Sequence, residues 1–255
     1  MDTGSIQGFR EKMKMGAVLG TFMKTCDPGF VETAGYGGMD FVILDMEHGP
    51  ISIEHMQENI RAAQVAGVVP IVRVSSREEI SKVLDIGAAG VQIPQVSTAE
   101  EARAAVREAR FFPYGERGVC RFVRAAHYSA MDRAEYFPEA NKALVIVQLE
   151  GQEAIRNMDA IMEAEGIDIL FIGPYDLSQS LGVPGETMHP SVVSQMEEIV
   201  AKAKAKGILV GTFTDDRETL EMWSRAGVQY LSYSVDMGIF CEACRRIREQ
   251  LDSIG

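Results

Sequence analysis

Acidic, basic and amide side chains gather at the ends of several short apolar runs in this sequence. The first group, Asp45-Met46-Glu47-His48, lies at the end of one of these runs. The polar residues at all such run ends are Asp45, Glu47, His48, Arg73, Gln148, Glu150 and Asp176. Carboxylates can hold a divalent cation, an imidazole can carry a proton, and a guanidinium can bind a carboxylate. Brought together, these groups would form a site for acid–base chemistry on an anionic substrate.

Glu150 and Asp176 are the candidate metal ligands. Residues two apart in a strand face the same way, so Gln148 and Glu150 share a face. A buried carboxylate without a partner costs several kcal/mol, so these groups must pair, accept hydrogen bonds or hold a cation. Hard oxygen ligands that leave other positions to water and substrate suit Mg²⁺ or Mn²⁺, with Co²⁺ also compatible. Asp176 could also cap a helix that begins near Leu177.

His48 is the expected acid–base group. It follows Asp45 and Glu47 closely enough for a carboxylate to fix the tautomer of its ring, as a general base near neutral pH requires. An isolated histidine would more often be a capping or surface group, but a position among converging strand ends favours catalysis. Arg73 has two interpretations that stay open. It is a structural partner of these carboxylates, or it binds a substrate carboxylate or a developing enolate.

Apolar, β-branched runs alternate with amphipathic segments along the whole chain, which predicts alternating strands and helices. The predicted strands are residues 17–23, 41–47, 69–74, 90–94, 145–150, 170–174, 208–213 and 230–236. The predicted helices between them are residues 53–66, 99–110, 155–165, 191–206 and 217–226. Strands this continuously apolar are typical of a parallel sheet that helices cover on both faces.

Repeated strand–helix units in 255 residues predict an α/β protein with a single (β/α)8 TIM barrel over residues 1–255. An open doubly wound sheet is the alternative, but that fold usually has fewer strands and a glycine-rich phosphate-binding motif that the sequence lacks. In a barrel the carboxyl ends of the strands form the active-site mouth, so the polar run ends would meet there. The extended connections 96–143 and 175–207, after strands 4 and 6, are expected to build or cover that site.

Composition excludes several kinds of partner. Lys and Arg total 25 against 37 Asp and Glu, a net charge of −12, and no basic run offers a surface for nucleic acid or anionic lipid. The longest uncharged apolar stretch, residues 65–72, is too short to span a membrane, and residues 1–14 lack an export pattern. These features predict a cytoplasmic protein.

Cys241 and Cys244 form a C-x-x-C in an apparent C-terminal helix and are expected to be structural thiols, not a redox or zinc site.

Several motifs in order along the chain resemble one family. Asp45-Met46-Glu47-His48 is similar to its D-x-E-H segment, and Arg73 to the arginine of its third strand. The other matching segments are residues 84–88, 92–94, 112–118, 147–150 and 171–178. Together they resemble the metal-dependent class II pyruvate aldolases of the HpcH/HpaI family, which include 4-hydroxy-2-oxoheptanedioate and 2-keto-3-deoxy sugar acid aldolases.

This resemblance implies a TIM barrel that cleaves or forms 4-hydroxy-2-oxo acids, with pyruvate and an aldehyde as the other side of the reaction. It also implies a homo-hexamer, a trimer of dimers in which a C-terminal helix is exchanged between subunits. The roles that it implies are a divalent metal ion on Glu150 and Asp176, acid–base function for His48 with Asp45, enolate stabilisation by Arg73, and binding of the 2-oxo acid by Gln148, Gly173, Pro174 and Tyr175. No predicted strand has a lysine in its interior, which argues against a Schiff-base aldolase.

The sequence departs from the family pattern at two places. Tyr175 stands where a small residue is expected, so it would narrow the pyruvate site or add a phenol. Arg121 and Arg124 replace part of a small-residue run, and they would either reach an anionic aldehyde across a subunit boundary or form ordinary surface contacts. Two other functions stay open: a lyase for a CoA thioester such as malyl-CoA or citramalyl-CoA, and a barrel that binds a 2-oxo acid without turnover.

Overall fold

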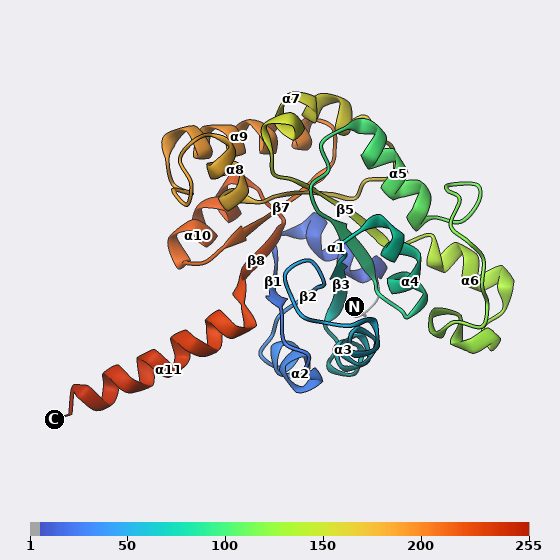
Figure 1. Cartoon of the computed structure of the whole chain (residues 1–255), viewed down its shortest axis with the longest axis horizontal. Coiled ribbons are helices and arrows are strands. Elements are labelled where there is room, and N and C mark those ends of the chain that lie inside the picture. The colour runs from blue at the N-terminus through green and yellow to red at the C-terminus, as the bar shows by residue number, and fades with distance from the viewer. Residues whose placement is uncertain (1–5, 255) are drawn as a thin grey trace.

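The structure is a computed structural model that describes residues 6–254 (Figure 1). Its strands close into one barrel in the order β1 to β8, and every neighbouring pair is parallel. The strands are β1 (Val18–Met23), β2 (Phe41–Asp45), β3 (Val69–Arg73), β4 (Gly90–Ile93), β5 (Leu144–Leu149), β6 (Ile169–Ile172), β7 (Leu209–Thr214) and β8 (Tyr230–Val235). The predicted (β/α)8 barrel is confirmed, with each predicted strand in place.

Helices connect the strands and cover the barrel. They are α1 (Ile6–Met15), α2 (Pro28–Tyr36), α3 (Ile53–Ala66), α4 (Ile80–Asp85), α5 (Ala99–Ala109), α6 (Arg133–Ala140), α7 (Gln152–Ile161), α8 (Pro174–Ser180), α9 (Pro190–Ala205), α10 (Arg217–Ala226) and α11 (Asp236–Asp252). Short 3-10 turns lie at Arg77–Glu79 and Arg124–Ser129. Within residues 6–254, no helix is both long enough and apolar enough to cross a membrane.

Local capping explains why some helices have the predicted bounds. α3 begins after Ser52 and α10 after Asp216, whose side chains each accept a backbone N–H of the first turn. Both helices end at a glycine in the left-handed region, Gly67 with φ 72° and Gly227 with φ 95°.

The predicted bounds of α7 are wrong. The helix begins after Gly151 and ends at Ile161, whereas the predicted segment was 155–165. Met162 and Ala164 are still buried although they lie in the turn that follows the helix. The apolar spacing therefore continues past the helix, and burial alone does not mark where the backbone leaves the helical conformation.

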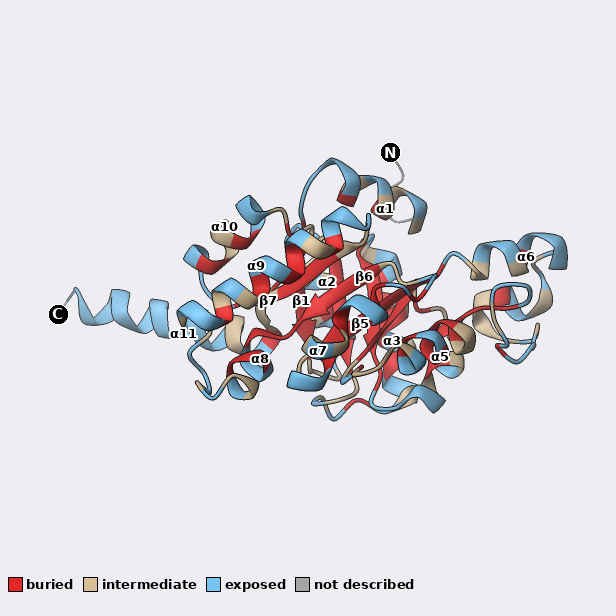
Figure 2. Ribbon diagram, turned by 90° about the horizontal axis from the view of Figure 1, so that it is seen from above, coloured by how far each residue is buried: buried red, intermediate tan, exposed pale blue. Residues whose placement is uncertain are grey.

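The barrel interior is packed from its amino end. Phe9 and Met13 of α1 lie in the same buried cluster as Phe41 and Tyr230, whose rings stack with centroids 3.9 Å apart. Figure 2 shows the buried strands surrounded by helices with exposed outer faces. The filled floor leaves the carboxyl ends of the strands as the side on which a substrate can bind.

The connection after β4 packs elsewhere than expected. α5 returns the chain to the amino ends of the strands, so the residues after it lie at that end and do not cover the mouth. Phe111, Tyr136 and Phe137 form a separate aromatic cluster there. A cavity of about 1160 Å³ lies between this segment, the start of β3 and the residues just before β4. The connection after β6, by contrast, supplies the α8 residues that border the mouth.

Arg121 and Arg124 belong to this distant connection. Arg121 donates from Nη2 to the backbone carbonyl of Met131 at 2.8 Å, and Arg124 donates from Nη1 to that of Ile86 at 2.9 Å. Within the described chain both arginines therefore hold their own connection in place.

The C-terminal helix α11 projects away from the barrel (Figure 1). Its Phe240, Ile247 and Leu251 side chains are 57%, 66% and 59% exposed. Cys241 and Cys244 lie on the same helix and are exposed and free, so they fill no core in this chain. Exchange of α11 between subunits stays a prediction.

Candidate active site

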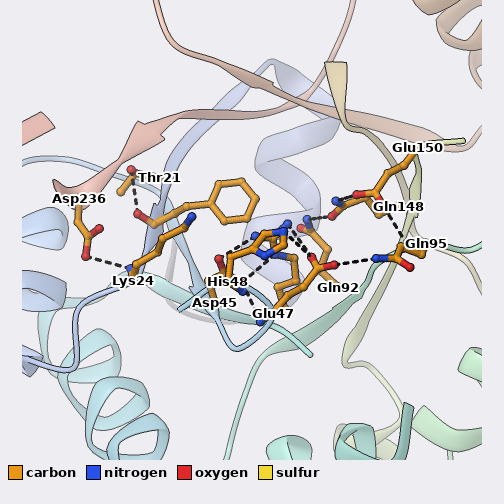
Figure 3. Close-up of polar contacts among 12 residues, drawn as sticks. Thr21, Lys24, Asp45, Glu47, His48, Gln92, Gln95, Gln148, Glu150 and Asp236 are labelled. Carbon is orange, nitrogen blue, oxygen red and sulfur yellow. Dashed lines mark hydrogen bonds and ion pairs between the residues drawn. The ribbon is translucent and has the colours of Figure 1, made fainter. Parts of the chain in front are cut away.

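The structure gathers the predicted site residues at the carboxyl ends of the strands. Asp45 and Arg73 are the last residues of β2 and β3, Gln148 lies near the end of β5, Glu150 follows that strand, and Asp176 is in the first turn of α8. Figure 3 shows the group from β2 and β5 facing one another. A cavity of about 180 Å³ lies at this mouth, with Arg73, Gln148 and Asp176 in its walls.

Asp45 and Arg73 form a buried ion pair that strand register dictates. The two residues are direct partners in the β2–β3 ladder. Nε and Nη2 of Arg73 donate to the two carboxylate oxygens of Asp45 at 2.8 and 2.7 Å, and the residues are 7% and 0% exposed. Such a pair is stable in a barrel interior only with good geometry and further hydrogen bonds. Oδ1 of Asp45 has these, because it also accepts the backbone N–H groups of Glu47 at 3.0 Å and His48 at 3.3 Å.

Glu47 links Arg73 to His48. Nη1 of Arg73 lies 2.9 Å from Oε2 of Glu47, and the guanidinium carbon lies 4.7 Å from the centroid of the Phe22 ring. Nε2 of His48 lies 3.8 Å from the same Glu47 oxygen, and the His48 side chain is 63% exposed. Asp45 contacts the backbone of His48, so Glu47 is the carboxylate that faces the ring. The geometry thus differs from a His48–Asp45 side-chain pair, because Asp45 is occupied by Arg73.

Amide side chains hold Glu150 in position. Gln148 donates to Oε1 of Glu150, and Gln92 of β4 donates to the amide oxygen of Gln148 at 2.6 Å. The backbone N–H of Gln95 donates to Oε2 of Glu150 at 3.2 Å, and its side chain donates to Oε1 of Glu47 at 3.3 Å. Gln95 therefore links the two acidic residues, as Figure 3 shows.

Glu150 sits in an environment that disfavours its charge. Burial raises the pKa of its carboxyl to about 7; the hydrogen bond from Gln148 opposes this shift, and the negative charges of Asp176 and Glu47 add to it. A cation placed beside this carboxylate would stabilise its ionised form.

The space above Gly173 fits such a cation. A Cβ added to Gly173 would lie 3.4 Å from Oδ2 of Asp176 and 3.6 Å from Oε1 of Glu150, so the missing side chain leaves a position that both carboxylates border. No group of three or more His, Cys, Asp and Glu residues among those described is arranged to hold a metal. A metal at this position would therefore take its other ligands from water and substrate, as Mg²⁺ commonly does.

Pro174 and Tyr175 of α8 also line the cavity. The Tyr175 hydroxyl donates to Oδ2 of Asp215, and its ring packs against Phe213 with centroids 6.0 Å apart. The hydrogen bond to Asp215, followed by burial, raises the pKa of Tyr175 to about 12. The phenol is thus a fixed wall of the mouth, and it stays protonated at neutral pH.

Four residues at the mouth were missed from the sequence: Lys24, Gln92, Gln95 and Asp215. Lys24 directly follows β1 and Asp215 directly follows β7, so the strand-end rule that found the others could have found them. Gln95 directly follows the predicted strand 90–94, but the direction of its side chain depends on a backbone φ of 56°, which the sequence does not indicate.

Comparison with known proteins agrees with this geometry. The family model described as HpcH/HpaI aldolase/citrate lyase matches residues 19–243. The 2-keto-3-deoxy-L-rhamnonate aldolase of Salmonella gallinarum is 35% identical over 240 residues, which cover 92% of this chain and 89% of that protein.

Solved structures give the same result. An HpcH/HpaI aldolase/citrate lyase family protein from Burkholderia cenocepacia has a TM-score of 0.90 at 30% identity, covering 96% of this chain and 99% of its own. The citrate synthase SbnG has a TM-score of 0.84 at 31% identity, covering 96% of each chain. The chain therefore belongs to the HpcH/HpaI aldolase/citrate lyase family and is a carbon–carbon lyase.

Proposed function

We propose that this lyase is a divalent-metal-dependent aldolase that cleaves or forms 4-hydroxy-2-oxo acids, with pyruvate and an aldehyde as the other side of the reaction. The observation that carries this proposal is the pair of carboxylates, Glu150 and Asp176, that border the open space at Gly173 beside the buried Arg73. The named activity of the Salmonella relative, cleavage of a 2-keto acid, supports the same substrate class.

Glu150 and Asp176 would hold the metal ion, with Mg²⁺ or Mn²⁺ the expected ions. When bound, the ion would polarise the 2-oxo group and so lower the free energy of the enolate. Gln148 and Gln95 orient Glu150 through the hydrogen bonds to its two oxygens. This arrangement keeps the carboxylate in one rotamer before a ligand arrives, which reduces the entropy lost on binding.

Arg73 would bind the carboxylate or the developing enolate oxygen of the 2-oxo acid. The hydrogen bonds of Arg73 to Asp45 and its ion pair with Glu47 leave a second N–H on each terminal nitrogen for substrate. Because Asp45 fixes the guanidinium and Phe22 supports its face, these donors are oriented before the substrate binds. Gln148 and the segment from Gly173 to Tyr175 would form the remaining wall against the pyruvate portion.

His48 would carry the protons. Its Nε2 would take the proton of the C4 hydroxyl as the C3–C4 bond breaks. It would then give a proton to C3 of the resulting enolate, which becomes the methyl group of pyruvate. Glu47, 3.8 Å from that nitrogen, would stabilise the protonated ring. Asp45 contributes by holding Arg73 and the turn that carries His48.

The proposal is tested by deuterium uptake at the methyl group of pyruvate, followed by NMR with Mg²⁺ or Mn²⁺ and after EDTA treatment. We expect metal-dependent exchange that falls roughly 100-fold or more in His48→Ala. His55→Ala, an exposed histidine at the start of α3, is the matched control and should exchange at the wild-type rate. Exchange that survives EDTA would contradict the metal role, and absence of exchange with every metal would refute the pyruvate chemistry.

A CoA-thioester substrate is the alternative to exclude, because the structural relative SbnG is named a citrate synthase. Formation of acetyl-CoA and glyoxylate from malyl-CoA at a rate comparable to the aldol reaction would favour that alternative. Binding of pyruvate without proton exchange would favour a barrel that binds its ligand without turnover.

The exposed apolar residues of α11 support the proposed homo-hexamer. Phe240, Ile247 and Leu251 leave an apolar surface on a helix that projects from the barrel. Light scattering should give the mass of a hexamer for the intact protein and a smaller mass after Ile247→Glu with Leu251→Glu. A monomer for the intact protein would contradict the assembly.

A further inference from the structure

Lys24 is a cation in the mouth that the proposed mechanism does not use. It directly follows β1 and lies two residues after Phe22, so both side chains are presented on the same face of the strand. Phe22 and Lys24 both line the cavity of about 180 Å³ that also contains Arg73 and Asp176. Lys24 is half-buried there and is not a freely solvated surface residue.

The ammonium group of Lys24 has no partner among residues 6–254. Lys24 makes its polar contact through the backbone N–H, which donates to Oδ2 of Asp236 at 3.0 Å. Arg73 differs in this respect, because Asp45 and Glu47 both neutralise its guanidinium. Lys24 therefore supplies a positive charge to the cavity that the protein itself does not compensate.

Lys24 lies across the mouth from Glu150, one of the two carboxylates proposed to hold the metal. In Figure 3 Lys24 and Glu150 are on opposite sides of the group of polar residues. A 2-oxo acid bound between Arg73 and Gly173 would leave the Lys24 side of the same cavity for the aldehyde portion of the substrate.

We propose that Lys24 binds an anionic group, a carboxylate or a phosphate, on the aldehyde portion of the substrate. The inference rests on the proposed aldolase function and specifies its substrate class: 4-hydroxy-2-oxo acids with a second negative charge beyond C4. A lysine is a compact charge on a flexible stem, so it can follow such a group without the fixed bidentate geometry that arginine demands.

The experiment compares three aldehydes with a two-carbon skeleton as acceptors for pyruvate: glyoxylate, glycolaldehyde phosphate and neutral glycolaldehyde. We expect the wild-type enzyme to prefer at least one anionic aldehyde in kcat/KM. Lys24→Met should reduce the ratio of anionic to neutral kcat/KM by roughly 10- to 100-fold, mainly through the KM of the anionic aldehyde. Lys24→Arg should retain most of the ratio, because it keeps the charge.

Lys14→Met is the matched control, since Lys14 is an exposed lysine on α1 at the closed end of the barrel. It removes the same charge from the protein and should leave the ratio unchanged. A wild-type enzyme without preference for either anion, or a Lys24→Met variant with the wild-type ratio, would overturn the inference. The loss of preference for only one of the two anionic aldehydes would identify which group Lys24 binds.

Two further readouts separate this inference from the proposed function. Metal-dependent proton exchange into pyruvate needs no aldehyde, so exchange together with an unaltered ratio would refute only the role of Lys24. Absence of exchange would refute the aldolase proposal and this inference with it. Reduction by borohydride in the presence of pyruvate, followed by a mass increase at Lys24, would show a Schiff base at that amine and overturn its role as a charge partner.

Discussion

Replacing Glu150 with glutamine should stabilise the metal-free protein at neutral and alkaline pH while it impairs metal binding. The change keeps the shape of the side chain and removes its charge. In the folded protein, burial raises the pKa of the Glu150 carboxyl from an ordinary value of 4.5 to about 7. The wild-type side chain must therefore ionise in a place that disfavours the charge, whereas glutamine does not ionise.

The sign and size follow from this shift. Below pH 4.5 the carboxyl is protonated in the folded and unfolded states, so it has no effect on stability. Between pH 4.5 and 7 the unfolded chain loses the proton first, and the wild-type free energy of unfolding falls by about 1.4 kcal/mol per pH unit. The loss reaches roughly 3 kcal/mol near pH 7 and stays constant above it.

Urea unfolding in EDTA, measured from pH 5 to pH 8 for wild type and Glu150→Gln, checks this prediction. The difference in unfolding free energy between the two proteins should grow with pH and level off above about pH 7. If the amide NH2 group of the new glutamine faces the backbone N–H of Gln95, the difference in unfolding free energy shifts by the same amount at every pH. The change of this difference with pH is therefore the quantity that tests the prediction. Added Mn²⁺ at pH 8 should stabilise the wild type by mass action and the variant much less. A difference that does not vary with pH would refute the reasoning.

Further predictions concern the other groups of the mouth. Asp45→Asn leaves the buried Arg73 with less compensation, so urea unfolding should show a loss of about 3 kcal/mol, and kcat/KM should fall as well. Gly173→Ala should fold normally, because the added Cβ would make contacts no closer than 3.4 Å. Its affinity for Mn²⁺, measured by calorimetry, should fall roughly 10-fold, and wild-type affinity would contradict the proposed metal position. Asp215→Asn should lower the pKa of Tyr175 from about 12 toward 10. The ultraviolet absorbance of the phenolate should then appear at lower pH, and this signal should be missing in Tyr175→Phe. An unchanged titration would mean that Asp215 does not hold the phenol.

The strands and the positions of the mouth residues follow from sequence because both depend on local pattern. A parallel strand buried on both faces is apolar throughout, so the polar residue that interrupts it marks its end. Parallel pairing then brings the ends together, and Asp45 and Arg73 become direct neighbours in the β2–β3 ladder. Three of the catalytic and metal candidates, Asp45, Arg73 and Glu150, are placed by this argument alone.

Other contacts depend on backbone geometry that no residue pattern encodes. Gln95 reaches Glu47 and Glu150 only because its φ is 56°, an uncommon conformation for a residue other than glycine. The segment after α5 was expected over the mouth because long connections in barrels usually lie there. Its actual position follows from the direction of α5, which carries the chain to the opposite end before Phe111 and Tyr136 form their own cluster.

Lys24 shows why a strand-interior rule is too narrow for this kind of site. The absence of lysines inside the predicted strands argues against a Schiff-base aldolase, but Lys24 lies one residue beyond the end of β1. Catalytic groups in a barrel come from strand ends and from the residues just after them, so this lysine faces the same cavity as Arg73. Glu150 and Asp176 are therefore the residues that favour metal chemistry. Both border the space at Gly173, and a Schiff-base mechanism has no role for two carboxylates at that position. Two results are therefore expected together. Proton exchange into pyruvate should need a metal ion, and borohydride should not label the protein.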